Sequence, residues 1–192
     1  MLKLIVISSM LIISCSQKST NTRSFISSSQ AMQTTDTKKI YQFKVQGLEG
    51  DQIDFASFKG KKILVVNTAS ACGYTPQYKE LEELYEKYKD RLVVVGFPAN
   101  NFGAQEPGTN ADIKTFCQKN YGVTFPMAAK ISVKGADIAP IYQWLTNKEK
   151  NGVLDAEIKW NFNKFLIDEN GHIIAKFDSK VTPMSTDITG KL

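Results

Sequence analysis

The sequence predicts an α/β domain whose central mixed sheet is flanked by helices. Two apolar runs, 63–67 and 92–97, are separated by a segment with helical periodicity over 76–89. A strand–helix–strand unit of this kind implies parallel pairing with a right-handed crossover. Further along, Asn170-Gly171 separates two more apolar runs, which is a strong signal for an antiparallel hairpin. The two patterns together predict a sheet that contains both parallel and antiparallel strands.

The start of the chain has the pattern of a secretory signal. Lys3 supplies a positive charge, residues 4–13 are apolar apart from two serines, and Cys15 follows the small residue Ser14. The apolar run is too short to cross a bilayer as a helix. A cysteine at this position resembles the lipobox of bacterial lipoproteins, which implies cleavage after Ser14 and lipidation of Cys15. In an ordinary signal peptide, the alternative, Cys15 would be incidental.

These features divide the chain into three predicted segments. Residues 1–14 form the lipoprotein-type signal peptide, and residues 15–39, rich in Ser, Thr, Gln and Asn, form a flexible tether. Residues 40–192 form a single domain, because about 150 residues suffice for one core. We therefore expect an exported lipoprotein that is anchored to a membrane and faces the periplasm or the cell exterior.

The first half of the domain predicts a hairpin and then the parallel unit. Segments 41–45 and 52–55 alternate in the way of short strands and predict an N-terminal β-hairpin. Strand 63–67 follows, and helix 76–89 begins after Thr75, a good N-cap residue.

The second half predicts helices and then the antiparallel pair. Loop 98–108 leads to a helix over 111–121, which Asn110 caps and Gly122 closes. A shorter helix covers 140–146. Strands over 165–168 and 173–177 and a final helix complete an order of elements that resembles the thioredoxin-like fold.

Cys72 lies in the turn between the first buried strand and the following helix. Unpaired N–H groups and the helix dipole favour an anion there, and the thiolate is the reactive form of cysteine. The alternative is a small buried residue in a turn. Because parallel strands share one carboxyl edge, loop 98–108 belongs to the same edge. Segment 160–163, which leads into an antiparallel strand, should reach it too.

Composition excludes several classes of function. The net charge of +5 is modest and spread along the chain, so we expect no nucleic-acid surface. Three cysteines without a CxxC motif give neither a dense disulfide framework nor a thioredoxin-type dithiol. The single histidine, His172, falls in a predicted turn, and no metal-ligand cluster is visible. We therefore expect neither a histidine base nor a bound metal.

Segments 67–75, 96–108 and 159–166 closely resemble the three signature blocks of glutathione peroxidases, and the likeness runs from about 41 to 183. The resemblance implies a thioredoxin-like fold and the reduction of hydrogen peroxide and of organic or lipid hydroperoxides without a cofactor. It also implies a catalytic tetrad, namely Cys72, Gln105, Trp160 and Asn161. Taken singly, Trp160 could be a core residue, Gln105 a turn residue and Asn161 a cap.

Cys117 lies in segment 116–126, which resembles the block that carries the resolving cysteine in thioredoxin-dependent members of the family. The resemblance implies a disulfide between Cys72 and Cys117 that a thioredoxin-like dithiol reduces, with glutathione as a more doubtful donor. Cys117 also falls on the apolar face of its predicted helix, so a buried inert thiol is the alternative.

The other expected partners follow from the same likeness. No insertion for tetramer contacts occurs between 126 and 160, which implies a monomer, and a membrane tether would suit lipid hydroperoxides. Two other functions compete with the peroxidase. The missing CxxC argues against a thiol–disulfide oxidoreductase, and the four retained tetrad residues argue against a non-enzymatic lipoprotein scaffold.

Overall fold

The computed structural model describes residues 38–192. The predicted signal peptide, Cys15 and almost all of the predicted tether lie outside the described residues, so the division at 14 and 39 stays a prediction. Within residues 38–192, no helix combines the length and the apolar character needed to cross a membrane.

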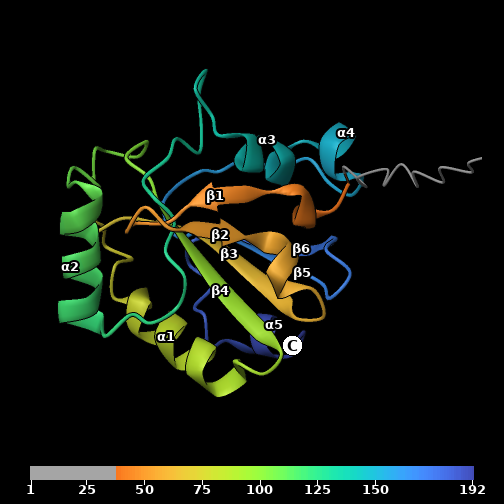
Figure 1. Ribbon diagram of the computed structural model, residues 1–192, viewed down its shortest axis with the longest axis horizontal. Coiled ribbons are helices and arrows are strands. Elements are labelled where there is room, and N and C mark those ends of the chain that lie inside the picture. Colours follow the sequence, from red (N-terminus) through yellow and green to blue (C-terminus); the bar gives the residue numbers. More distant parts are fainter. Residues whose placement is uncertain (1–37) are drawn as a thin grey trace, which may run out of the picture. The chain divides into compact units, whose positions relative to one another are not determined.

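A four-stranded mixed sheet lies at the centre of the domain (Figure 1). Its strand order is β4-β3-β5-β6, and its members are β3 (Lys62–Thr68), β4 (Leu92–Pro98), β5 (Lys164–Ile167) and β6 (Ile173–Phe177). Strand β3 is parallel to β4 and antiparallel to β5, and β5 is antiparallel to β6. The predicted mixed sheet is therefore confirmed. A separate antiparallel pair, β1 (Lys44–Gln46) with β2 (Gln52–Asp54), forms the predicted N-terminal hairpin.

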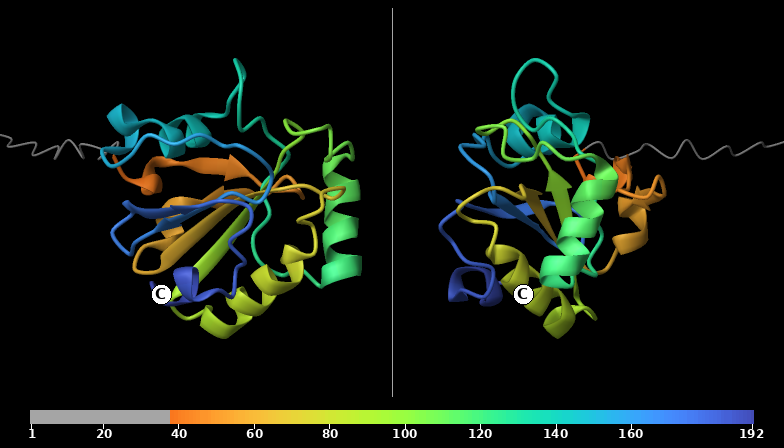
Figure 2. Two further views of the ribbon diagram at one scale, coloured as in Figure 1. Left: turned by 180° about the vertical axis from the view of Figure 1, so that it is seen from behind. Right: turned by 90° about the vertical axis from the view of Figure 1, so that its left-hand side faces the viewer.

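Helices cover both faces of the sheet, with α1 and α5 on one side and α3 and α4 on the other (Figure 2). The helices are α1 (Gln77–Tyr88), α2 (Asn110–Tyr121), α3 (Pro140–Thr146), α4 (Lys148–Asn151) and α5 (Thr186–Thr189). Alternate residues of a strand point to opposite faces, so β3 contributes to two cores. Ile63 and Val65 pack in the core that includes α3, whereas Leu64 and Val66 pack in the core that includes α1 and α2.

The ends of the predicted hairpin differ from the expectation. Tyr41 belongs to a short 3-10 helix, η1 (Ile40–Gln42), because the Ile40 carbonyl accepts the Phe43 N–H at 3.0 Å and tightens the chain. Phe55 opens a second 3-10 helix, η2 (Phe55–Phe58). There the Asp54 carboxylate accepts the Ala56 N–H at 2.9 Å and ends the strand.

Two predicted helix caps are wrong, although both helices are present. Thr75 does not cap α1, because its hydroxyl bonds back into the Cys72 turn. Thr109 rather than Asn110 caps α2, in a capping box with Asp112. The Asn110 side chain instead accepts the Lys130 N–H at 3.0 Å. Gly122, with φ of 63°, closes α2 as expected.

Candidate active site

Cys72 lies in a tightly bonded turn between the end of β3 and the start of α1. Its side chain is 7% exposed and the thiol is free. The Cys72 N–H donates to the Thr75 hydroxyl oxygen at 3.0 Å, and that hydroxyl donates to the Ala69 carbonyl at 2.8 Å. The Tyr74 backbone N–H points at the sulfur from 3.4 Å. The misassigned cap residue Thr75 therefore holds the turn that carries the sulfur.

Gln105 belongs to a loop that lies directly on this turn. The Ala71 N–H donates to the Gln105 carbonyl at 3.0 Å, and the Ser70 hydroxyl donates to a Glu106 carboxylate oxygen at 3.2 Å. Glu106 is 1% exposed, and this burial raises the pKa of its carboxyl group. The expected meeting of loop 98–108 with the Cys72 turn is thus present in the fold. The sequence reasoning did not single out Glu106, whose signal is an acidic residue directly after Gln105.

Asn161 joins the same region from the far end of the chain. It is fully buried, and its Nδ2 donates to Gln105 Oε1 at 3.0 Å. Because Gln105 accepts through its oxygen, its NH₂ group remains available as a donor. The Asn161 Oδ1 atom is buried and has no hydrogen-bond partner among residues 38–192.

Trp160 lies at the surface beside this pair, with 40% of its side chain exposed. Its ring contacts Phe102 of the 98–108 loop, with 5.7 Å between the ring centroids. This exposure argues against the alternative of a core role for Trp160, since a core residue would be buried. Within the described chain, the hydrogen bond to the sulfur comes from Tyr74, and Gln105, Trp160 and Asn161 do not bond to it directly. The tetrad roles of these residues stay predictions.

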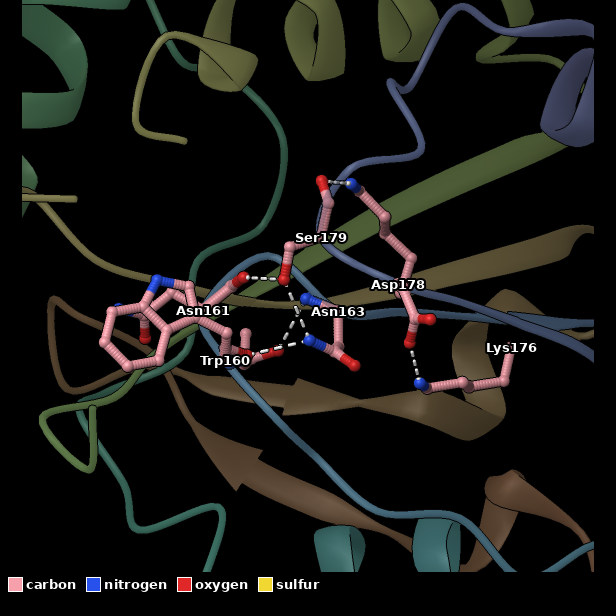
Figure 3. A network of polar contacts seen from close by, with 8 residues as sticks. Trp160, Asn161, Asn163, Lys176, Asp178 and Ser179 are labelled. Carbon is pink, nitrogen blue, oxygen red and sulfur yellow. Dashed lines mark hydrogen bonds and ion pairs between the residues drawn. The ribbon is translucent and has the colours of Figure 1, made fainter. Parts of the chain in front are cut away.

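Ser179 supports the segment that carries Trp160 and Asn161. Its hydroxyl donates to the Asn161 carbonyl at 2.6 Å and accepts from Asn163 Nδ2 at 3.1 Å (Figure 3). The same Asn163 Nδ2 donates to the Trp160 carbonyl at 2.8 Å. Ser179 is nearly buried and lies 18 residues further along the chain than Asn161. No local sequence pattern indicates this partnership, because it exists only once β5 and β6 have paired.

Two residues next to the predicted tetrad have left-handed backbone conformations. Ala104, directly before Gln105, has φ of 51°, and Phe162, directly after Asn161, has φ of 63°. They are the non-glycine residues with positive φ in the described chain. Such conformations cost about 1–2 kcal/mol each for residues with a Cβ. Strained backbone of this kind clusters at functional sites, where the surrounding structure holds it.

Cys117 is a free, buried thiol on α2, with 1% of its side chain exposed. Burial raises its pKa from the ordinary 9.0 to about 11, although the neighbouring Tyr78 hydroxyl opposes the shift. Cys117 is among the residues that line a cavity of about 570 Å³ beside the β1–β2 hairpin. This burial fits the alternative of an inert thiol, and the resolving role of Cys117 stays a prediction.

The remaining sequence expectations concern metals and His172. Residues 38–192 contain no group of three or more side chains that could hold a metal ion. His172 lies in the turn between β5 and β6, where its backbone N–H donates to Asp168 Oδ1 at 2.8 Å. His172 follows the end of β5, whereas segment 160–163 precedes its start, so the two lie at opposite ends of this strand.

Comparisons with known proteins agree on one family. A sequence model described as "Glutathione peroxidase" matches residues 40–146. The glutathione peroxidase-like peroxiredoxin gpx1 of Schizosaccharomyces pombe is 51% identical over 75% of this chain and 91% of its own length. A glutathione peroxidase of Lactococcus lactis is 50% identical over 75% of this chain and 92% of its own length.

Solved structures give the same fold. The crystal structure of Trgpx in its apo form has a TM-score of 0.61 and 41% identity, and it covers 79% of this chain and 94% of that chain. A secreted disulfide oxidoreductase of Mycobacterium tuberculosis has a TM-score of 0.55 at 15% identity, over 81% of this chain and 96% of that chain. At that identity the second likeness concerns the thioredoxin-like fold alone.

Proposed function

The chain belongs to the glutathione peroxidase family, and we propose from this that it is a thiol peroxidase whose reactive residue is Cys72. The observation that carries the assignment to this residue is the shared location of three distant segments. The Cys72 turn bonds to the Gln105 loop through Ala71, and Gln105 bonds to Asn161. These bonds link the turn that carries Cys72 to neutral side chains that can donate hydrogen bonds.

The chemistry follows from these groups. The Cys72 thiolate attacks one peroxide oxygen, the O–O bond breaks, and the leaving oxygen takes a proton to become water or an alcohol. The sulfur is oxidised to a sulfenic acid. The Gln105 amide and the Trp160 indole N–H carry no charge, so they can stabilise the developing oxyanion without competing for its proton. Donor contacts that are long without substrate commonly tighten when it binds.

Regeneration is proposed to use Cys117. Its thiol would attack the sulfenic acid of Cys72, which forms a disulfide and releases water, and a thioredoxin-like dithiol or glutathione would then reduce that bond. A disulfide requires Cβ atoms within about 4.5 Å of one another. Because Cys117 is 1% exposed and packed in the core, the attack is proposed to follow a partial opening of α2. The cavity beside α2 offers room for that movement.

The predicted location remains part of the proposal. A lipid on Cys15 would anchor the enzyme as a monomer on the outer side of a membrane, where peroxidised lipids are available as substrates. The support is the order of charge, apolar run, small residue and cysteine in residues 1–15. Metabolic labelling with a radioactive fatty acid checks it, because a Cys15→Ala variant should take up no label and should leave the membrane fraction.

Two variants test the catalytic assignment. Cys72→Ser should lower the rate of hydrogen peroxide consumption by at least about 10³-fold, since the nucleophile is gone. Cys117→Ser is the matched control, because it removes the other described thiol. It should consume one equivalent of peroxide at the normal rate and then fail to turn over with thioredoxin and thioredoxin reductase.

Two results would contradict the proposal. Peroxide consumption that survives in Cys72→Ser would exclude Cys72 as the nucleophile. Full thioredoxin-dependent turnover in Cys117→Ser would keep the peroxidase but remove the resolving role. Running the wild-type enzyme with glutathione in place of thioredoxin ranks the two donors.

A further inference from the structure

Asn67 makes four hydrogen bonds to the segment that carries Trp160 and Asn161. It is fully buried near the end of β3, five residues before Cys72. Its side chain donates from Nδ2 to the Trp160 carbonyl at 3.0 Å and accepts the Asn163 N–H through Oδ1 at 3.0 Å. Its backbone donates to the Asn163 carbonyl at 3.3 Å and accepts the Phe162 N–H at 2.6 Å. Every polar group of Asn67 is therefore used on one short segment.

These bonds continue the contact between the two segments beyond the point where the regular pairing of β3 with β5 ends. The regular ladder between β3 and β5 ends at Val66, which pairs with Lys164. Beyond that point the segment that precedes β5 turns at Phe162, whose φ of 63° is incompatible with an extended strand. The amide side chain of Asn67 follows the turn and bonds to both of its ends. An apolar residue here would continue the run of β3 but would leave the Asn163 N–H without this acceptor.

We propose that Asn67 is a positioning residue of the peroxidase reaction, which fixes Trp160 and Asn161 relative to Cys72. The inference rests on the proposed function and adds a residue to it. Asn67 and Cys72 belong to one continuous segment. The Asn67 side chain bonds to segment 160–163 on both sides of Asn161, at Trp160 and at Asn163. The bond from Asn161 to Gln105 carries the same alignment to the third segment. The Asn67 side chain itself has no role in bond making or breaking.

A displacement of the segment should therefore reduce the rate of the first oxidation. Misplacement of a reacting or donating group by about 1 Å can lower a rate by about 100-fold. We expect Asn67→Ala, which removes both side-chain bonds, to lower the second-order rate constant of Cys72 oxidation by about 10- to 100-fold. Asn67→Asp keeps the size and the acceptor for Asn163 while losing the donor to Trp160. Asn67→Asp replaces the alanine variant if that variant does not fold. We expect its rate constant for Cys72 oxidation to be at least about threefold lower than that of the wild type.

Asn151 supplies a matched control. It is also a buried asparagine whose side chain bonds to backbone groups, with four such bonds against two for Asn67, namely to Trp144, Val153 and, twice, Leu154. It lies at the end of α4, on the side of the sheet away from α1. Asn151→Ala removes four side-chain hydrogen bonds where Asn67→Ala removes two, so it should lower the melting temperature at least as much. It should leave the oxidation rate within about twofold, because its partners lie within residues 144–154 and not in the Cys72 site.

A second readout separates the inference from the proposed function. Trp160 becomes the only tryptophan in a Trp144→Phe background, because the chain has two. Adding Asn67→Ala should raise the acrylamide quenching constant of Trp160, whereas Asn151→Ala should not. Quench-flow alkylation and mass spectrometry give the rate of Cys72 oxidation in the same proteins.

The outcomes differ for the two ideas. Folded Asn67→Ala protein with an unchanged rate and unchanged Trp160 quenching would overturn the positioning role. So would an Asn151→Ala variant that loses as much rate as the Asn67 variants. If the wild-type protein does not oxidise Cys72 with peroxide, the proposed function fails, yet altered Trp160 quenching in Asn67→Ala would still support the structural part of the inference.

Discussion

The burial of Cys117 makes a quantitative prediction about its reactivity. In a Cys72→Ser variant, we expect iodoacetamide to modify Cys117 at least about 100-fold more slowly in the folded protein than in the unfolded one. The thiolate is the reacting form, and burial raises the pKa from 9.0 to about 11. Two pH units of difference reduce the thiolate fraction at neutral pH about 100-fold. The 1% exposure of the side chain slows the reagent further.

Peptide-resolved mass spectrometry measures this rate separately from any modification of Cys15. The reaction is followed from about pH 7 to 11, with protein in concentrated urea as the reference. The rate in the folded state should keep rising beyond the ordinary pKa of 9.0 and level off only near 11. Since the Tyr78 hydroxyl lowers the pKa of Cys117, Tyr78→Phe should slow the modification again.

Equal rates in the folded and unfolded protein would refute this reasoning. A pH profile that levels near 9.0 would do the same, because it would mean that solvent reaches the thiol without any opening of α2. In either case the disulfide with Cys72 would need a smaller rearrangement than the structure implies.

Three further predictions concern stability. Ser179→Ala removes the hydroxyl that bonds to the Asn161 carbonyl, and should lower the free energy of unfolding in urea by about 1–3 kcal/mol. Gly103→Ala, at φ of 63°, should lower the free energy of unfolding by about 1–2 kcal/mol, because a residue with a Cβ is strained in this conformation. Ala104→Gly, at φ of 51°, should change it by less than about 1 kcal/mol, because the relief of strain offsets the greater entropy of the unfolded chain. Burial lowers the pKa of Lys164 to about 7, so the wild type should lose stability relative to Lys164→Met as the pH falls from 10.5 to 7, by up to about 5 kcal/mol.

The sign of the Lys164 prediction follows from proton binding. Between its folded pKa of about 7 and its ordinary value of 10.5, the folded state holds fewer protons at this side chain than the unfolded state. Acidification through that range therefore favours unfolding, and the effect is complete below 7. A constant difference between wild type and Lys164→Met from pH 10 to 7 would contradict it. For the glycine pair, equal losses in both variants would show that φ is not the cause, and a fully stable Ser179→Ala would mean that its bonds are not needed.

The sheet could be predicted from the sequence because its signals are local and strong. Runs of consecutive apolar residues in β3 and β4 indicate strands buried on both faces, and Asn170-Gly171 sets the turn between β5 and β6. The N-caps of α1 and α2 are harder to predict, because Thr75 and Thr109 compete with neighbouring residues for the same N–H groups. Only the folded turn shows that the Thr75 hydroxyl bonds to Cys72 instead of starting α1.

The candidate site is partly predictable, because the positions of its loops follow from the local signals for the strands. The carboxyl edge shared by β3 and β4 follows from their parallel pairing, and it brings the Gln105 loop to Cys72. The partners of the 160–163 segment were not foreseen. Asn67 had a weak signal, as a polar residue that directly follows four apolar ones in β3, whereas Ser179 had none. Contacts between residues almost a hundred positions apart depend on the completed sheet rather than on any local pattern.

The way the described chain enters the domain decides how the enzyme can be attached to a support. The Ile40 N–H bonds to the Gly171 carbonyl at 3.0 Å, so the amino-terminal end is fastened at the β5–β6 turn. That turn adjoins the beginning of β3, and the reactive sulfur follows its end, about 20 Å away along the strand. A tag or surface linkage made directly at residue 38 is therefore attached at the opposite end of β3 from the Cys72 turn.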